Sequence, residues 1–417
     1  MNVKLGFGQS YQELHIPDEN VEAVLHANNI PETKEEQELI TAALQNPIGT
    51  KKLCELVKPG MKIAIITSDI TRPMPTYKVI GQILDEIYAA GVKKENIVLV
   101  FALGSHRNHT SEEIKKIAGE RAVQEILCVD ANSKDVVHMG TTTSGTPVDI
   151  TRCVAEADFR IALGNIEYHY FAGYSGGAKA IMPGVATREA IQANHRFMVK
   201  KEACAGNIDD NPVRKDIEEA VREFCRVDFI LNVVLDEHKK IVCAIAGDVV
   251  KAHRKGCMFL DKIYRKEIKH KADIVVVSQG GAPKDLNLYQ LQKSLDNAKH
   301  AVKKDGIIIL VGSAKEGYGE KIFSEWIDAA DSPQALINRI EREFTLGGHK
   351  AAAIAMVEEI AEVILVSEMP DKDVINCFMK PMKNLQQAFD YAMQKKGDQA
   401  KVIIMPFGGS TLPILVK

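Results

Sequence analysis

Short apolar runs recur along the chain, and amphipathic stretches separate many of them. The eight runs cover residues 62–67, 96–104, 159–165, 228–235, 273–281, 306–312, 363–367 and 401–409. They are rich in β-branched residues and end in Gly, Ser or Asn, a pattern typical of buried parallel strands. Between them, segments such as YKVIGQILDEIYAAG predict helices, here with Gly91 at the C-terminal cap. The chain is therefore predicted to be an α/β protein with mostly parallel sheets flanked by helices.

The length of 417 residues favours more than one domain, since a domain typically holds roughly 150 residues. A short basic, polar stretch, KEIKHKAD (266–273), comes just before a new predicted strand. We therefore expect an N-terminal domain over residues 1–268 and a C-terminal α/β domain over residues 269–417. The last strand, which ends in PFGGSTLP, can belong to the C-terminal domain or return to the first.

Composition narrows the class of protein. Hydrophobic residues make up 46% of the chain and charged residues 26%, as in ordinary globular proteins. The net charge of −3 offers no global basic field for nucleic acid or an anionic membrane. The start MNVKLGFGQSYQEL lacks a signal-peptide pattern, and the eight cysteines are scattered without a CxxC pair. We expect a cytoplasmic protein with buried free thiols, which binds neither nucleic acid nor membrane.

Chemically reactive side chains follow four of the predicted strands. They are Asp69 and Arg72, then His106, then His169 and Lys179, and finally Gln290 and Lys293. In α/β proteins, ligands bind beyond the carboxyl ends of the strands. We therefore expect these residues to line one active site in a cleft between the two domains.

The segment HYFAGYSGGAKAIMPG (169–184) combines a histidine, four glycines and a lysine. Gly173, Gly176 and Gly177 can let backbone N–H groups approach an anion, although a tight strand-to-helix turn would also use glycines. Lys179 has alanine on both sides, so the segment is not a GxxxxGK[ST] phosphate loop. Desolvation in this small-residue setting would lower the pKa of Lys179 and make it nucleophilic, which suits covalent attachment of a cofactor.

Three further predictions have alternatives that the sequence leaves open. His195 lies in TREAIQANHRFM, a predicted helix with Thr187 at the N-cap and Ala190 at N3, but one imidazole does not make a metal site from protein ligands alone. Arg72 can clamp a carboxylate or phosphate, or can pair with Asp69 to close a loop. Gln290 and Lys293 lie three residues apart on one face of a predicted helix, and they either bind a ligand or are solvated.

Five segments in a fixed order give the chain a resemblance to a known family. They are DITRP (69–73), GSHR (104–107), EYHYFAGYSGGAK (167–179), NHR (194–196) and DLNLYQLQK (285–293). Over nearly its whole length the chain resembles the nickel-pincer-nucleotide-dependent lactate racemase family. The resemblance implies an isomerase that racemises or epimerises 2-hydroxy acids by abstracting and returning a hydride. It also implies that residues 1–268 form the cofactor-binding and catalytic domain.

The resemblance also implies roles for individual residues. Lys179 would carry a pyridinium-3,5-bisthiocarboxylic acid mononucleotide through a thioamide, and His195 would bind nickel beside two sulfurs and a carbon of that cofactor. His106 and His169 would be the catalytic acid/base pair. The residues implied to contact the cofactor are Asp69, Arg72, Tyr174, Ser175, Gly176 and Gly177, and those implied to contact the substrate are Arg72, Gln290 and Lys293. Other proteins would have to make and install the cofactor.

One segment departs from the family pattern. The lactate enzymes of the family carry a tryptophan near the substrate in the second domain, whereas the single tryptophan here, Trp326, is predicted on a different helix. The corresponding region is GGHKAAA (347–353), which offers His349 and Lys350 unless GGHK simply begins a helix. Lactate and a larger or more polar 2-hydroxy acid are therefore both open as substrates.

Two other functional classes compete with a racemase. One is a carrier of nickel or cofactor that does no chemistry, which the intact His106 and His169 disfavour. The other is a phosphate-handling, nucleotide-binding enzyme, which the missing GK[ST] and the lack of an acidic magnesium-binding cluster disfavour.

Overall fold

The computed structural model describes residues 1–28, 30, 34–104, 106–236 and 238–416. It divides into two compact units, Ile30–Lys262 and a second unit made of Met1–Asn29 with Ile263–Lys417. The first 29 residues thus belong with the C-terminal half of the chain, unlike the predicted division into 1–268 and 269–417. The reason is strand pairing: β3 (Val21–Val24) joins β19 (Val402–Met405), and β20 (Leu412–Leu415) pairs with β14 (Arg265–Ile268). The last strand therefore stays in the C-terminal unit.

The unit Ile30–Lys262 is built on a six-stranded sheet with the order β13-β12-β9-β4-β5-β6. Its strands are β4 (Ile63–Ser68), β5 (Ile97–Ala102), β6 (Leu127–Asp130), β9 (Phe159–Asn165), β12 (Phe229–Leu235) and β13 (Ile241–Gly247). All neighbours are parallel except β12 and β13. Two antiparallel hairpins complete the unit's strands, β7 (Val136–Thr141) with β8 (Pro147–Thr151), and β10 (Tyr168–His169) with β11 (Gly173–Tyr174).

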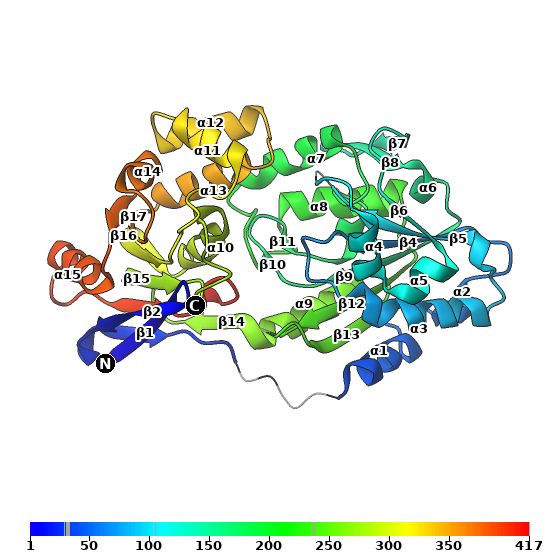
Figure 1. The fold of residues 1–417 in the computed structure, drawn as a ribbon, viewed down its shortest axis with the longest axis horizontal. Coiled ribbons are helices and arrows are strands. Elements are labelled where there is room, and N and C mark those ends of the chain that lie inside the picture. The colour runs from blue at the N-terminus through cyan, green and yellow to red at the C-terminus, as the bar shows by residue number, and fades with distance from the viewer. Residues whose placement is uncertain (29, 31–33, 105, 237, 417) are drawn as a thin grey trace. The chain divides into compact units, whose positions relative to one another are not determined.

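The helices of this unit are distributed between and before its strands along the chain (Figure 1). They are α1 (Glu36–Gln45), α2 (Leu53–Leu56), α3 (Thr76–Ala89), α4 (Ser111–Ala118), α5 (Glu120–Glu125), α6 (Arg152–Ala155), α7 (Arg188–His195), α8 (Pro212–Glu219) and α9 (Lys251–Tyr264). Short turns of tighter or wider helix lie at Lys94–Asn96, Gly177–Ala180, Arg196–Val199 and Ala220–Phe224. As predicted, Gly91 follows the end of α3 with a φ of 80°, a conformation that glycine adopts without strain.

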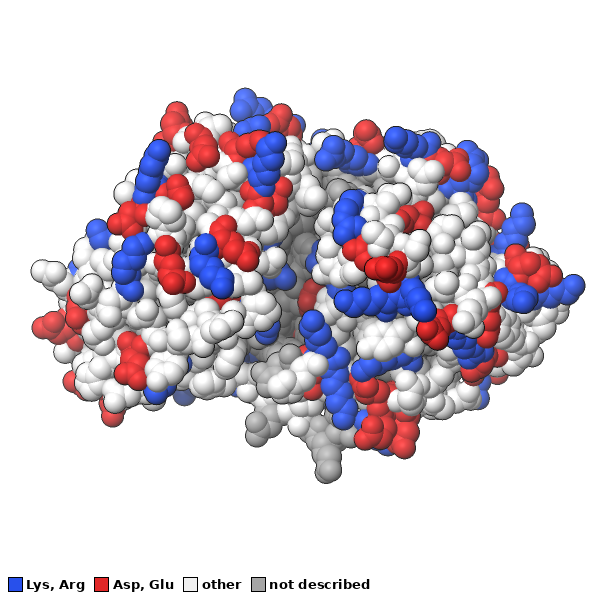
Figure 2. Space-filling model, viewed as in Figure 1, with Lys and Arg blue, Asp and Glu red and all other residues white. Residues whose placement is uncertain are grey.

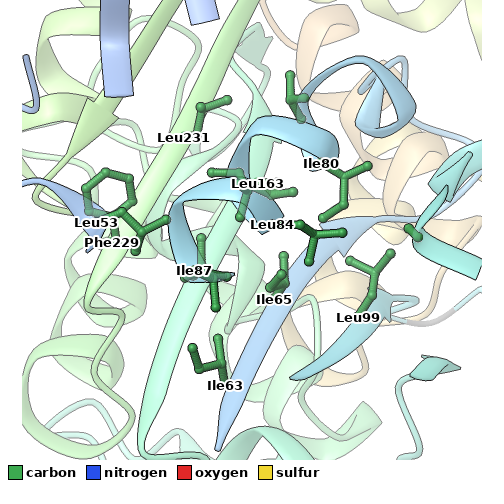
Figure 3. Packing of buried hydrophobic residues seen from close by; sticks show 14 of the residues in the cluster. Leu53, Ile63, Ile65, Ile80, Leu84, Ile87, Leu99, Leu163, Phe229 and Leu231 are labelled. Carbon is green, nitrogen blue, oxygen red and sulfur yellow. The ribbon is translucent and has the colours of Figure 1, made fainter. Parts of the chain in front are cut away.

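The core of this unit lies between the sheet and α3. Ile80, Leu84 and Ile87 recur at helical spacing on α3 and are buried against the strands (Figure 3). The strands contribute alternate side chains to the same layer, including Ile65 of β4 and Leu99 of β5. This packing fixes the carboxyl ends of β4 and β5, from which two of the predicted active-site segments emerge.

The other unit has a fully parallel six-stranded sheet with the order β18-β17-β16-β15-β19-β3. Its remaining strands are β1 (Asn2–Phe7), β2 (Ser10–His15), β15 (Ala272–Ser278), β16 (Val302–Val311), β17 (Ala361–Val366) and β18 (Lys380–Met382). Its helices are α10 (Leu288–Ala298), α11 (Lys321–Asp328), α12 (Pro333–Arg342), α13 (Gly348–Glu358), α14 (Asp371–Asn376), α15 (Leu385–Lys396) and a short turn at Asp18–Asn20.

The eight apolar runs all form strands with a parallel neighbour, four in each unit, so the predicted α/β class is confirmed. On the face drawn in Figure 2, lysines and arginines are interspersed with aspartates and glutamates. No helix in the described ranges is both long and apolar enough to span a membrane. The cysteines are free thiols, but five of them are partly exposed, contrary to the expectation that all are buried.

Candidate active site

Asp69 and His106 form a hydrogen-bonded pair beyond β4 and β5. Their loops are adjacent because the two strands are parallel neighbours in the sheet. The Nδ1 atom of His106 lies 2.7 Å from Oδ2 of Asp69, and Thr71 Oγ1 donates to both carboxylate oxygens. Burial raises the pKa of Asp69, but His106, Thr71 and Arg72 outweigh it and hold the pKa below its ordinary value. In its neutral form, His106 therefore carries its proton on Nδ1 and has a lone pair on Nε2.

His109, which sequence reasoning passed over, fixes the position of this pair. Its Nδ1 lies 2.6 Å from Oδ1 of Asp130, and its Nε2 accepts a hydrogen bond from the backbone N–H of Ile70 at 3.0 Å. Both ring nitrogens are thus used to tie the segment containing Asp69 to β6. In the GSHR motif, Ser105 lies outside the described residues.

Arg72 faces Glu167, not Asp69. Its Nη1 lies 3.9 Å from Oε1 of Glu167, and both side chains are about 40% exposed, at 42% and 39%. The local Asp69–Arg72 ion pair that the sequence left open is therefore not what the structure shows. A partly exposed pair at this distance is weak, so the guanidinium remains able to bind an anionic ligand.

The glycine-rich segment forms a hairpin followed by one short helical turn. After β10 and β11 the chain turns at Gly176 and Gly177, whose φ values are 74° and 59°. Gly173 also has a positive φ of 78°, and a Cβ there would lie 2.1 Å from the carbonyl oxygen of Asn207. The tight turn that the sequence offered as an alternative is thus present, and it places Lys179 in the turn Gly177–Ala180.

Internal hydrogen bonds hold this segment in place. Ser175 Oγ donates to the carbonyl of Asn165, and Gly177 N–H donates to Oδ1 of Asn232 at 2.9 Å. His253 on α9 donates from Nε2 to the carbonyl of Ser175 at 2.7 Å. Burial lowers the pKa of His253 far below its ordinary value, so this histidine is neutral. The hydroxyl of Tyr174 lies 2.9 Å from Asp261.

Phe171 brings three of the predicted residues together. The ring of His169 lies 4.5 Å from the Phe171 ring centre, the ring of His195 lies 4.8 Å from it, and the amine of Lys179 lies 5.9 Å from it. The sequence placed these three residues in one site, and the structure shows that they surround one aromatic ring. In the sequence, Phe171 stands out only as part of the segment EYHYFAGYSGGAK.

A second residue that sequence reasoning missed, Arg214 on α8, adds a buried positive charge. Its Nε and Nη2 donate to the carbonyls of Ala172 and Tyr174, while its Nη1 is buried without a hydrogen-bond partner among the described residues. Burial lowers the pKa of Arg214 to about 10. Burial, together with the charges of Arg214 and Arg72, lowers the pKa of Lys179 far below its ordinary value. This is the direction that the sequence predicted for Lys179, and it raises the share of neutral amine, the form that can act as a nucleophile.

His169 differs from His106 in how its ring is held. Its Nδ1 accepts a hydrogen bond from the backbone N–H of Ala172 at 3.2 Å, so the neutral ring carries its proton on Nε2. Burial, with the charges of Lys179 and Arg72, lowers the pKa of His169 far below its ordinary value. The ring is consequently neutral at physiological pH.

His195 is the last residue of α7, and this helix begins as predicted, with Thr187 Oγ1 accepting from the N–H of Ala190. The imidazole is 7% exposed, and its Nδ1 lies 2.8 Å from Oδ1 of Asn194. Within the part of the chain that the structure describes, no group of three or more His, Cys, Asp and Glu side chains is arranged to hold a metal ion.

The remaining candidates belong to the other unit. Gln290 and Lys293 lie one turn apart on α10 and are exposed, and Asn287 caps this helix through the N–H of Gln290. The GGHK segment forms the start of α13, the structural alternative noted above. There, the amine of Lys350 donates to the carbonyl of Tyr289 at 2.6 Å. As predicted, Trp326 lies on a different helix, α11.

Comparison with known proteins identifies the family. A model of the lactate racemase N-terminal domain matches residues 7–206, and one of the lactate racemase C-terminal domain matches residues 268–412. Lactate racemase of Thermoanaerobacterium thermosaccharolyticum is 35% identical over 99% of both chains, and lactate racemase of Lactiplantibacillus plantarum is 36% identical over 92% of this chain and 91% of its own.

Solved structures agree with this assignment. The lactate racemase apoprotein from T. thermosaccharolyticum superposes with a TM-score of 0.90 at 34% identity, covering 99% of this chain and all 100% of the other. A Thermotoga maritima protein shares the fold with a TM-score of 0.66 at 20% identity, over 92% of this chain and 100% of its own. The chain therefore belongs to the lactate racemase family, a family of isomerases.

Proposed function

We propose that this protein racemises lactate or a related 2-hydroxy acid, with a nickel-pincer nucleotide bound covalently to Lys179 and its nickel bound to His195. The observation that carries the proposal is the arrangement around Phe171, where a nucleophilic amine and two imidazoles approach one ring. A carrier without chemistry would need the amine and the metal-binding imidazole but not the second histidine.

The residues present fit such a cofactor. Among the described residues the amine of Lys179 has no hydrogen-bond or ion-pair partner, and a neutral amine is the form that can attack an acyl or thioacyl carbon. Positive charge is concentrated around Lys179, since Arg72 and Arg214 lie near it. The Nη1 atom of Arg214 is buried without a hydrogen-bond partner among the described residues, which favours a negatively charged ligand beside it. Gly176 and Gly177 would let the backbone approach its phosphate closely. In this proposal Tyr174 and Ser175 complete the cofactor-binding segment.

Reversible hydride transfer at carbon is the chemistry that such a cofactor supplies when bound. The protein's own residues would move the hydroxyl proton of the substrate. His106 is ready for this, because Asp69 holds its Nδ1–H and leaves Nε2 free to take the proton. Loss of this proton and of the C2 hydride turns the 2-hydroxy acid into a 2-keto acid, whose opposite face is reached after rotation.

His169 would serve the other enantiomer. Its Nε2 bears the proton in the described tautomer, so Nε2 can accept a proton only after the ring changes tautomer and releases the N–H of Ala172. Arg72 would hold the substrate carboxylate so that only the reacting carbon turns. Gln290 and Lys293 would also bind the substrate, and this role stays a prediction, as do the cytoplasmic location and the dependence on maturation proteins.

The decisive experiment is to produce the chain together with cofactor-maturation proteins and to measure its intact mass, its nickel content and its racemisation of D-lactate. We expect added mass and nickel in the unmodified protein but not in Lys179→Ala, and loss of racemisation in His106→Ala and His169→Ala by about 10²- to 10⁴-fold. A panel of larger D-2-hydroxy acids defines the substrate. Unchanged mass would refute the covalent cofactor, and full activity in both histidine variants would refute their roles.

A further inference from the structure

A chain of buried hydrogen bonds begins at His195 and runs away from the site. The Nδ1 of His195 lies 2.8 Å from Oδ1 of Asn194. An amide oxygen can only accept a hydrogen bond, so Nδ1 must carry the proton. The neutral ring then has its lone pair on Nε2, and only a nitrogen with a free lone pair can bind a metal ion.

The amide of Asn194 has one orientation, which its other contacts determine. The nitrogen Nδ2 lies 2.7 Å from Oδ2 of Asp216 and 3.1 Å from the carbonyl of Val213. Both partners are acceptors, so the opposite orientation would bring three oxygens together. Asn194 is fully buried on α7, and water cannot replace these partners.

Asp216 on α8 is in turn held rigidly. Its Oδ1 accepts from Thr142 Oγ1 at 2.5 Å, and its Oδ2 accepts from Thr146 Oγ1 at 2.7 Å. The side chain is buried, and these described partners are uncharged donors. Its hydrogen bonds are short, and the bond to Asn194 polarises the amide toward His195.

We propose that Asp216 and Asn194 are positioning residues that fix His195 as its Nδ1–H tautomer, so that Nε2 is presented to nickel. The inference rests on the proposed function in one respect, the role of His195 as the metal ligand. Metal-binding histidines commonly donate their second ring N–H to such a partner, and its loss weakens metal binding by about 10- to 100-fold.

The tautomer can be measured without cofactor or metal. In the cofactor-free chain labelled with ¹⁵N-histidine, two-bond ¹H–¹⁵N spectra distinguish protonated from unprotonated ring nitrogens, and His195→Gln identifies the signal of His195. We expect protonated Nδ1 and unprotonated Nε2 in the unmodified chain. In Asn194→Leu, which keeps the side-chain shape but lacks the acceptor, we expect a shift toward the Nε2–H form. Glu189→Gln on the exposed face of the same helix should change nothing.

A second variant covers the case in which Asn194→Leu does not fold. Asp216→Asn can keep the same contacts without the charge, so we expect a smaller shift of the tautomer. In the cofactor-loaded enzyme, nickel loss to a chelator should accelerate about 10- to 100-fold in Asn194→Leu and less in Asp216→Asn. An Nε2–H tautomer in the unmodified chain would overturn the inference, as would an unchanged tautomer in a folded Asn194→Leu variant. A chain with the expected tautomer that never acquires nickel would instead refute the proposed function.

Discussion

Lys179 should make the cofactor-free protein less stable than it would be with an uncharged residue at this position. Burial and the charges of Arg214 and Arg72 lower its pKa in the folded state, whereas Glu167 opposes them. The unfolded chain has no such environment, and its lysine titrates near the ordinary lysine pKa of 10.5. The folded state therefore binds fewer protons than the unfolded state between these two pKa values.

The size and sign of the effect follow from proton linkage. Below the folded-state pKa, both states hold the proton and the folded chain bears the full penalty. As pH rises from there to 10.5, the penalty falls by about 1.4 kcal/mol for each pH unit. Lys179→Met should therefore be more stable than the unmodified chain at neutral pH, by an amount that declines along this slope and levels off above 10.5. New apolar contacts of the methionine with Phe171 add a constant that leaves the slope unchanged.

The assay is urea unfolding followed by circular dichroism over the neutral and alkaline range. The quantity to plot is the difference in unfolding free energy between Lys179→Met and the unmodified chain, both cofactor-free. Lys116→Met, at an exposed position on α4, is the matched control and should stay within about 0.5 kcal/mol at every pH. A difference for Lys179→Met that does not vary with pH would refute the reasoning, because it would mean that the amine titrates equally in both states.

Three further substitutions test other parts of the molecule. Asp69→Asn should lower the steady-state rate of racemisation by at least about tenfold, because it removes the charge that stabilises protonated His106. The same substitution should reduce the loss of stability in acid unfolding, because the lowered pKa of Asp69 stabilises the fold only above that pKa. Gly177→Ala should cost about 1–3 kcal/mol in urea unfolding, because φ is 59° and the new Cβ would lie 2.8 Å from Cγ of His253. Phe229→Ala in the core should cost about 3–5 kcal/mol by the same measurement.

The fold was largely predictable because its strands are buried on both faces. A strand covered by helices must be apolar at every position, so each of the eight appeared as a continuous run. The elements that were missed lack this property. β3 is a four-residue edge strand with the sequence VEAV, and its pairing with β19 depends on residues far apart in the chain. The membership of the first residues in the C-terminal unit was therefore not visible in any local pattern.

The residues of the candidate site were predictable where a reactive side chain follows a strand in the sequence. They were not predictable where the packing of a helix brings the side chain to the site. Asp69 and His106 stand directly beyond apolar runs, and Lys179 lies in the glycine-rich segment that follows another, which made them candidates. Arg214 and His253 lie on helices α8 and α9, and a polar residue within an amphipathic helix normally indicates a solvated face. Only the folded chain reveals that both are buried against the glycine-rich segment. Arg214 donates a hydrogen bond to a carbonyl of this segment, and His253 donates to another and leaves no room for a Cβ at Gly177.

The two proposed acid/base histidines are not chemically equivalent. This inequality restricts which kinetic constants can differ between the two enantiomers of the substrate. The Nδ1 of His106 donates to a carboxylate, whereas the Nδ1 of His169 accepts from a backbone N–H. Proton transfer at His106 therefore needs no change of tautomer, while proton transfer at His169 does. Mirror-image substrates have equal free energies in solution, so kcat/KM must be the same in both directions. The inequality of the histidines can consequently alter kcat only together with KM, so an enantiomer that is processed faster at saturation must also have a proportionally higher KM.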